Sequence, residues 1–235
     1  MAVVLYSNER NHMPIEKIPF DIETGPRDYE DVIRFVPDEI LNREIRPDGR
    51  LTDPAKIKAD IHKKELERAK DIDDFISNKA ALSAVMGKVA TIGFKFPHKA
   101  EPEIWEGDEK DLLTRFWDLY HGRDKNMYLV GWNSEKFDMP FLWQRSVMLG
   151  VKHGVAWNNR YWDSHIDLMT VFTRGVYGQF VSLANAALAM GIGAKTGSGK
   201  DFYKLYTNPE TKQKAIEYAM NDIILTGKIS DALVQ

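Results

Sequence analysis

Two acidic residues stand two positions apart in the segment PFDIETGP, which covers residues 19 to 26. The apolar residues around them predict a strand, in which positions i and i+2 point to the same face. Asp21 and Glu23 therefore share one face, where neighbouring carboxylates repel each other unless a proton or a cation intervenes. Oxygen ligands of this kind suit Mg²⁺ or Mn²⁺. The alternative is an edge strand whose acids face water.

A third acid, Asp138, follows an apolar strand pattern over residues 126 to 133 and stands two residues before Pro140. Proline in a first turn predicts that a helix begins here. Asp138 is then either an ordinary N-cap of that helix or a functional acid at a strand-to-helix junction.

The last predicted helix, residues 211 to 233, carries Tyr218 and Asp222 four positions apart and hence on one face. They lie nearly opposite the expected apolar stripe and beside Leu225 and Ile229. The pair is either functional or half exposed. The expected stripe consists of Ile216, Ala219, Met220, Ile223 and Gly227.

The elements that must position these residues are strands first, then alternating helices and strands. Strands are predicted over residues 2–6, 18–24, 85–96, 102–107 and 126–133. Helices are predicted over 54–70, 108–123, 137–150, 182–192 and 211–233, and residues 165–172 are either a strand end or a short helix. This order predicts an α/β domain with a mixed sheet flanked by helices.

Residues 27 to 82 differ from the rest because they are strongly charged. Asp53 and Pro54 predict a helix start, and residues 54 to 70 hold six Lys or Arg against three Asp or Glu. The pattern indicates a solvated helix face; the alternative is a helix that contacts a nucleic-acid backbone.

The composition limits the classes of protein. The chain has 235 residues, 43% of them hydrophobic, which suits one medium-sized domain. Its formal net charge of −3 argues against a broad basic field, so any contact with nucleic acid must be local. The absence of cysteine excludes disulfides and thiolate sites. No signal peptide or membrane span is expected, and the predicted location is cytoplasmic.

The three motifs together resemble the DEDD family of 3′→5′ exonucleases in its tyrosine-bearing branch. D-x-E, N-x4-D and Y-x3-D occur in this order, and FDIET and YAMND match the motifs of that branch. The likeness is greatest to the proofreading exonuclease domain of family B DNA polymerases. In the histidine branch a histidine stands five residues before the last acid, where this chain has Glu217. The resemblance implies a single domain over residues 1–235 with an insertion at about 27–82.

The resemblance also implies a ribonuclease H-like fold whose acids gather at one edge of the sheet. Four acids would hold two Mg²⁺ or Mn²⁺ ions, and Tyr218 would orient the attacking water. The four acids are Asp21, Glu23, Asp138 and Asp222. The expected substrate contacts are the backbone at Ile22 and Thr24, the polar Asn133, the stacking candidates Phe137 and Trp132, and Lys195 or Lys200 on a phosphate.

The function that follows is hydrolysis of single-stranded DNA from its 3′ end, with any polymerase or replication partner on a separate chain. An RNA-trimming exonuclease and a catalytically silent nucleic-acid-binding module are the alternatives. The glycine-rich residues 191–201 do not fit a phosphate-binding loop, since Ala194 and Asp201 replace required residues. They predict a flexible loop. His165, between Asp163 and Asp167, belongs either to a structural turn or to an outer cluster around the site.

Overall fold

A computed structural model describes residues 15–156, 162–176 and 178–233. The strand predicted over residues 2–6 lies outside the described residues. None of the helices within those ranges is both long and apolar enough to cross a lipid bilayer.

A five-stranded mixed sheet forms the centre of the protein, in the order β3-β2-β1-β4-β5. The strands are β1 (Glu16–Pro26), β2 (Gly87–Phe94), β3 (Glu103–Trp105), β4 (Met127–Gly131) and β5 (His165–Asp167). β1 pairs antiparallel with β2 and parallel with β4, and β4 pairs parallel with β5. The predicted mixed sheet is confirmed, and β1 is its central strand. The alternative of an edge strand with acids facing water is therefore wrong.

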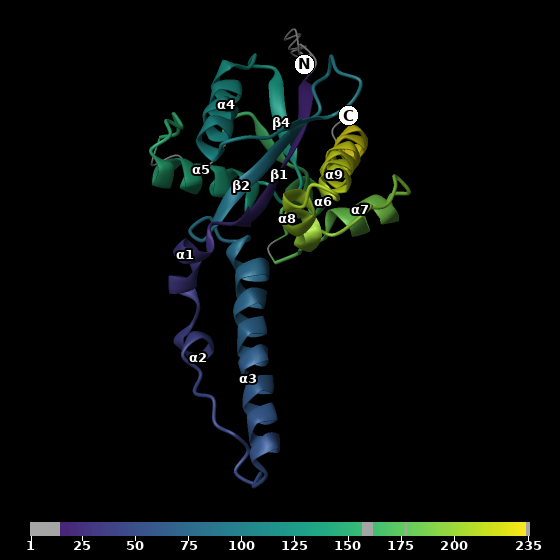
Figure 1. Ribbon diagram of the computed structural model, residues 1–235. Coiled ribbons are helices and arrows are strands. Elements are labelled where there is room, and N and C mark those ends of the chain that lie inside the picture. The colour runs from purple at the N-terminus through teal and green to yellow at the C-terminus, as the bar shows by residue number, and fades with distance from the viewer. Residues whose placement is uncertain (1–14, 157–161, 177, 234–235) are drawn as a thin grey trace, which may run out of the picture.

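One face of the sheet is covered by α4 (Glu109–Gly122) and α5 (Asp138–Leu149), as Figure 1 shows. Ile18, Phe20 and Ile22 of β1 point to this face, as strand alternation requires, and are buried in its core. The helices contribute Leu112, Leu113, Phe116, Met139 and Leu142 to the same core.

The other face of the sheet is covered by helices from the C-terminal half (Figure 1). These are α6 (Leu168–Phe172), α7 (Leu183–Ala189), α8 (Gly199–Thr207) and α9 (Lys212–Leu233). The acidic face of β1 therefore looks toward protein and not toward bulk water.

The orientation of α9 differs from the predicted one. Its buried face contains Tyr218 and Asp222, which were expected opposite the apolar stripe. Of that stripe Ala219 and Ile223 are buried as predicted, while Ile216 and Met220 are only partly buried. Small side chains explain the rotation, because they let the helix approach the sheet closely along this face. They are Ala215, Ala219, Thr226 and Ser230.

Most predicted helix ends are confirmed. The Asp53 carboxylate accepts a hydrogen bond from Ala55 N at 2.8 Å, Ser182 caps α7, and α5 ends at Gly150 with φ 68°. Two expectations change. Residues 165–172 form both a strand and a short helix, and the predicted loop at 191–201 gives way to α8 from Gly199.

Residues 27–82 form an arm that projects from the body of the protein (Figure 1). It contains the short helices α1 (Tyr29–Val32), η1 (Ile33–Phe35) and α2 (Asp38–Leu41), followed by α3 (Pro54–Phe75) and η2 (Ile76–Ala80). α3 spans 22 residues without one buried side chain. The arm therefore adds little to the hydrophobic core.

The chain leaving the arm is fixed to the body by a buried ion pair. Arg145 of α5 forms two hydrogen bonds to the Glu109 carboxylate, at 2.8 and 2.7 Å, and a third to Ala84 O at 3.1 Å. Glu109 also accepts a hydrogen bond from Val89 N in β2. Planar two-bond pairing of this kind fixes orientation as well as distance, so the base of the arm has a defined position against the sheet.

Candidate active site

A β-bulge lies at the acidic motif of β1. The register with β2 shifts between Glu23 and Thr24, after pairs that run regularly from Phe20 to Glu23. Bulges bend a strand and change where its side chains point, and they are common beside active sites. Asp21 and Glu23 precede the bulge and project toward α9.

Three carboxylates converge between β1 and α9. One oxygen each from Asp21, Glu23 and Asp222 lies within 4.8 Å of the others. Glu23 and Asp222 are buried, and Asp21 is half buried. Hard oxygen ligands at such spacing fit a divalent cation. The buried Oδ1 of Asp222 accepts no hydrogen bond in the described structure, which leaves it available for an ion.

Asp138 approaches the same place from α5. Its Oδ1 accepts a hydrogen bond from Ile22 N at 3.1 Å, between the two acids of β1. Asp138 is the first residue of the helix and does not act as its N-cap; Phe137 occupies that position without a side-chain cap. The strand-to-helix junction thus directs this acid at β1, although its oxygens lie outside the cluster of three.

Burial raises the pKa of all four acids, and repulsion from the other site acids adds to this for Asp21 and Glu23. For Asp21 the removal of water dominates, followed by the charges of Asp138, Glu23 and Asp222. Burial likewise raises the pKa of Glu23 well above its usual value and that of Asp138 to about 7. The pKa of Asp222 is also raised by burial, against the opposing effect of Lys195. Four such carboxylates favour cations strongly, because a cation removes the cost of ionising them together.

Lys195 is the cation nearest to these acids. Its Nζ lies 2.6 Å from Asp222 Oδ2 and 5.2 Å from the centre of the Tyr218 ring. Burial, with the charges of Glu23 and Asp222, raises the pKa of the Tyr218 phenol. Tyr218 therefore stays protonated at neutral pH, so it is suited to donating a hydrogen bond and not to acting as a base.

The predicted site residues all line one cavity of about 240 Å³. Besides the four acids and Tyr218, this includes the expected substrate contacts Ile22, Thr24, Asn133, Phe137 and Lys195, together with Trp132 and Lys200. The cavity also contains residues that sequence reasoning missed: Ser77, Ala81, Leu82, Gly199 and Tyr203. The first three come from the end of the arm, where no motif marked them. Tyr203 faces the site because residues 199–207 form a helix.

The loop that carries Asn133 into the cavity has a constrained backbone. Asn133 has φ 59°, a left-handed conformation that asparagine tolerates better than most residues. The Asp167 carboxylate accepts hydrogen bonds from Asn133 N at 3.0 Å and from Glu135 N at 3.1 Å. It also caps α6 through Met169 N. Asp167 therefore has a structural role in holding this loop.

His165 is also structural. Its Nε2 lies 2.8 Å from Ser134 Oγ, and burial lowers its pKa to about 4. The ring is neutral at physiological pH and packs edge-on against Phe20. His165 does not line the acidic cavity.

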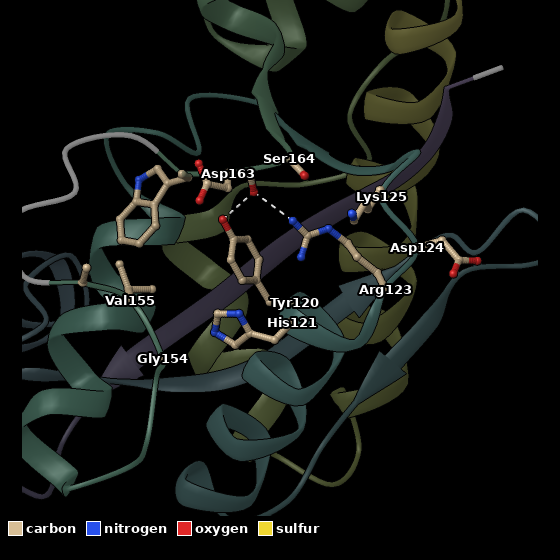
Figure 2. Close-up of a pocket in the computed structure, with 11 residues that line it drawn as sticks. Tyr120, His121, Arg123, Asp124, Lys125, Gly154, Val155, Asp163 and Ser164 are labelled. Atoms are coloured by element: carbon tan, nitrogen blue, oxygen red, sulfur yellow. Dashed lines mark hydrogen bonds between the residues drawn. The ribbon is translucent and has the colours of Figure 1, made fainter. Parts of the chain in front are cut away.

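A larger cavity of about 350 Å³ lies elsewhere, and Figure 2 shows its lining. Tyr120 and Arg123 both donate hydrogen bonds to Asp163 O there, at 2.5 and 2.8 Å. This cavity lies beside the amino ends of β4 and β5, whereas the acidic cavity lies at their carboxyl ends. Ligands of open α/β sheets bind at carboxyl ends, so position favours the smaller, acidic cavity as the active site.

Comparison with known proteins finds one matching family. A family model described as a predicted 3′-5′ exonuclease related to the exonuclease domain of PolB matches residues 80–227, more than half of the chain. The matched part begins at the end of the arm and contains Asp138, Tyr218 and Asp222, but not Asp21 or Glu23. A search of curated proteins finds no match.

A solved structure supports the fold. The chain is similar to the family B DNA polymerase from the hyperthermophilic archaeon Pyrobaculum calidifontis, with a TM-score of 0.57 and 18% sequence identity. The similarity covers 94% of this chain and 25% of the polymerase chain. At this identity the likeness concerns the fold alone, and it confirms the predicted ribonuclease H-like architecture.

Proposed function

Because the chain belongs to the family of predicted 3′-5′ exonucleases related to the exonuclease domain of PolB, we propose that it hydrolyses single-stranded DNA from the 3′ end. The observation that carries this proposal is the convergence of three carboxylates within 4.8 Å, from β1 and α9. Ionising these carboxylates together is unfavourable, so the cluster is suited to binding a divalent cation.

In this proposal the acids hold two divalent ions. Mg²⁺ or Mn²⁺, when bound as a pair, activates the attacking water and stabilises charge on the leaving oxygen. Asp21, Glu23 and Asp222 supply the nearest ligands, and Asp138 supplies the fourth acid. Lys195 balances Asp222 in the free protein. With Asp222 as a ligand of the ions, Lys195 would be free to contact the phosphate of the substrate.

The protonated phenol of Tyr218 orients the water. It stands one helical turn before Asp222 on α9, so a hydrogen bond from its hydroxyl can fix a water beside the acids. The high pKa of Tyr218 keeps this proton in place while the phosphodiester bond breaks.

The walls of the cavity suit one unpaired nucleotide. Phe137 and Trp132 offer apolar rings that can stack on a base without sequence preference. Asn133 offers a polar side chain, and the backbone at Ile22 and Thr24 lies where a terminal sugar would contact it. A base must leave its stack to enter such a cavity, which favours single-stranded ends.

The test compares DNA and RNA oligonucleotides labelled at the 5′ end, each with Mg²⁺, with Mn²⁺ and with EDTA. We expect the labelled DNA to shorten stepwise from its 3′ end and the reaction to stop on chelation. A block on the 3′ terminal nucleotide stops an exonuclease but not an endonuclease, so this substrate distinguishes the two. Faster shortening of RNA would reassign the substrate, and binding of DNA without any shortening would identify a silent binding module.

A further inference from the structure

The surface of α3 divides into two sides with different contacts. The side that faces the outgoing chain of the arm is engaged: Lys64 donates a hydrogen bond to Arg46 O at 2.8 Å, and Arg68 donates one to Arg43 O at 3.3 Å. Arg43 also pairs with Asp71 of α3 at 2.6 Å. These contacts hold the two halves of the arm together.

Three lysines of α3 take no part in these contacts, and all are exposed. Lys56, Lys63 and Lys70 recur every seven residues, so they form a stripe along the helix with a spacing of about 10.5 Å. Lys56 and Lys70 form no ion pair within the described part of the chain. Lys63 lies 3.8 Å from Glu67, with both side chains largely exposed. Such surface pairs contribute little, so Lys63 can exchange this partner for another anion.

α3 leads from the lysine stripe to the wall of the acidic cavity. The next position in the seven-residue series is Ser77, which lies in η2 just beyond the end of α3 and lines that cavity. Within α3 the stripe turns by only about 40° from Lys56 to Lys70. The distance along the axis from Lys56 to Ser77 is about 32 Å. Asp74 lies between Lys70 and the cavity.

The base of the arm is part of the cavity itself. Ser77, Ala81 and Leu82 line it together with Asp21 and Asp222. Thr24 Oγ1 of β1 donates a hydrogen bond to Ala81 O at 2.7 Å, which ties the arm to the strand that carries two of the acids. Leu82 is 66% exposed, so it presents an apolar side chain at the mouth of the cavity.

We propose that the arm is a guide for the substrate strand: phosphates upstream of the 3′ end bind the lysine stripe while the terminal nucleotide occupies the cavity. The proposal rests on the proposed function and extends it to the far end of the substrate. Three observations favour a nucleic-acid backbone as the occupant. The lysine stripe is positively charged, α3 continues into the wall of the cavity, and α3 has no buried side chain. The stripe is about 21 Å long, which corresponds to about six phosphates along one strand.

The test replaces the stripe without disturbing the arm. The stripe variant replaces three lysines by glutamine: Lys56→Gln, Lys63→Gln and Lys70→Gln. Glutamine keeps a long side chain of good helix propensity. The matched control is Lys110→Gln, Lys152→Gln, Lys214→Gln, which removes three exposed lysines from the body. Both variants are compared with the wild type on a DNA trinucleotide and on a strand of about 20 nucleotides, which exceeds the reach of the arm. A partial duplex with a 3′ single-stranded tail is a further substrate.

We expect the stripe variant to raise KM for the long strand roughly tenfold and to reduce the slope of log K against log salt by about 2, as loss of three phosphate contacts requires. Cleavage of the trinucleotide stays unchanged, and the control variant behaves like the wild type. A larger effect on the partial duplex than on the single strand would locate duplex on the arm.

An unchanged KM and salt slope in the stripe variant would overturn the proposal. An equal loss in the control variant would also overturn it, because net charge alone would then explain the effect. If light scattering showed that the stripe holds two copies together, with KM unaffected, the arm would be a dimer contact instead. Failure of the wild type to cleave the trinucleotide is a separate result, since it contradicts the proposed nuclease function and not the guide.

Discussion

The acidic cavity and the arm contain the same kinds of charged residue in opposite surroundings. In the cavity, Asp21, Glu23 and Asp222 are packed between β1 and α9, with Lys195 as the neighbouring cation. Along the arm, acids and bases alternate on exposed helix and pair with partners close in sequence, such as Asp60 with Lys64.

The pKa values of the two regions move in opposite directions. Burial raises the pKa of each cavity acid, whereas hydrogen bonds from Lys64 and Arg50 lower the pKa of Asp60 and Asp48 on the arm. Charge density in the sequence therefore does not identify chemistry. An acid acquires an altered affinity for protons and cations only where the fold removes water and brings other acids near.

The largest expected difference between the two regions is catalytic. Asp21→Asn removes the charge of a carboxylate that three other acids surround, and we expect activity to fall on the order of 10³-fold or more, since paired ions supply several kcal/mol of stabilisation. Because the burial of that charge is unfavourable without a cation, the metal-free variant should be at least as stable as the wild type. Initial rates and thermal unfolding in EDTA measure both effects.

The matched control is Asp60→Asn on the arm, which removes an equal charge and should leave the rate for a short substrate within about twofold of the wild type, as usual for surface changes. Equal losses in the two variants would mean that the acidic cavity is not the site of hydrolysis.

The next difference concerns stability and pH. The pKa of Asp138 is raised from 3.8 to about 7 in the folded protein, so the folded state holds this proton more tightly than the unfolded chain does. Between these two pKa values, folding takes up a proton at Asp138. This carboxyl group therefore makes the metal-free protein more stable as the pH falls. We expect thermal unfolding in EDTA to shift upward from pH 8 to pH 5, and Asp138→Asn to flatten that shift.

Mn²⁺ should reverse this dependence. At pH 8 a concentration of about 100 times Kd should raise Tm by about 5–10 °C, and at pH 5 protons compete with the ion and the increase should shrink. An increase of the same size at both pH values would show that Mn²⁺ binds outside the acidic cavity.

The smallest effect is expected at the tip of the arm. Asp53→Ala removes the N-cap of α3 and should cost about 1 kcal/mol of local helix stability. Since α3 contributes no buried side chain, the unfolding of the body should hardly change, while amide exchange in the first turn of α3 increases. A substantial fall in the Tm of the whole protein would instead show that the arm and the body unfold as one unit.

The sequence predicted the order of the elements because local signals decide it. Apolar alternation identified β1 and β2, and the Asp53-Pro54 and Ser182 caps identified the starts of α3 and α7. Periodicity predicted that Asp21 shares a face with Glu23, and Tyr218 with Asp222. The resemblance of the D-x-E, N-x4-D and Y-x3-D motifs to the exonuclease family selected the acids that line the cavity. α8 escaped prediction, since glycines and lysines at 191–201 indicate a loop until tertiary contacts bury Phe202.

What the sequence by itself determined was the set of residues with the right chemistry and the local element that carries each one. Only the tertiary structure decided that β1 is central, that α9 turns its Tyr218 face to the sheet, and that the end of the arm forms part of the cavity wall. The reason is physical: periodicity describes one helix or strand at a time, whereas these three facts depend on how elements that are distant in the sequence pair and pack. The same packing removes water from the acids and so gives them their affinity for a cation.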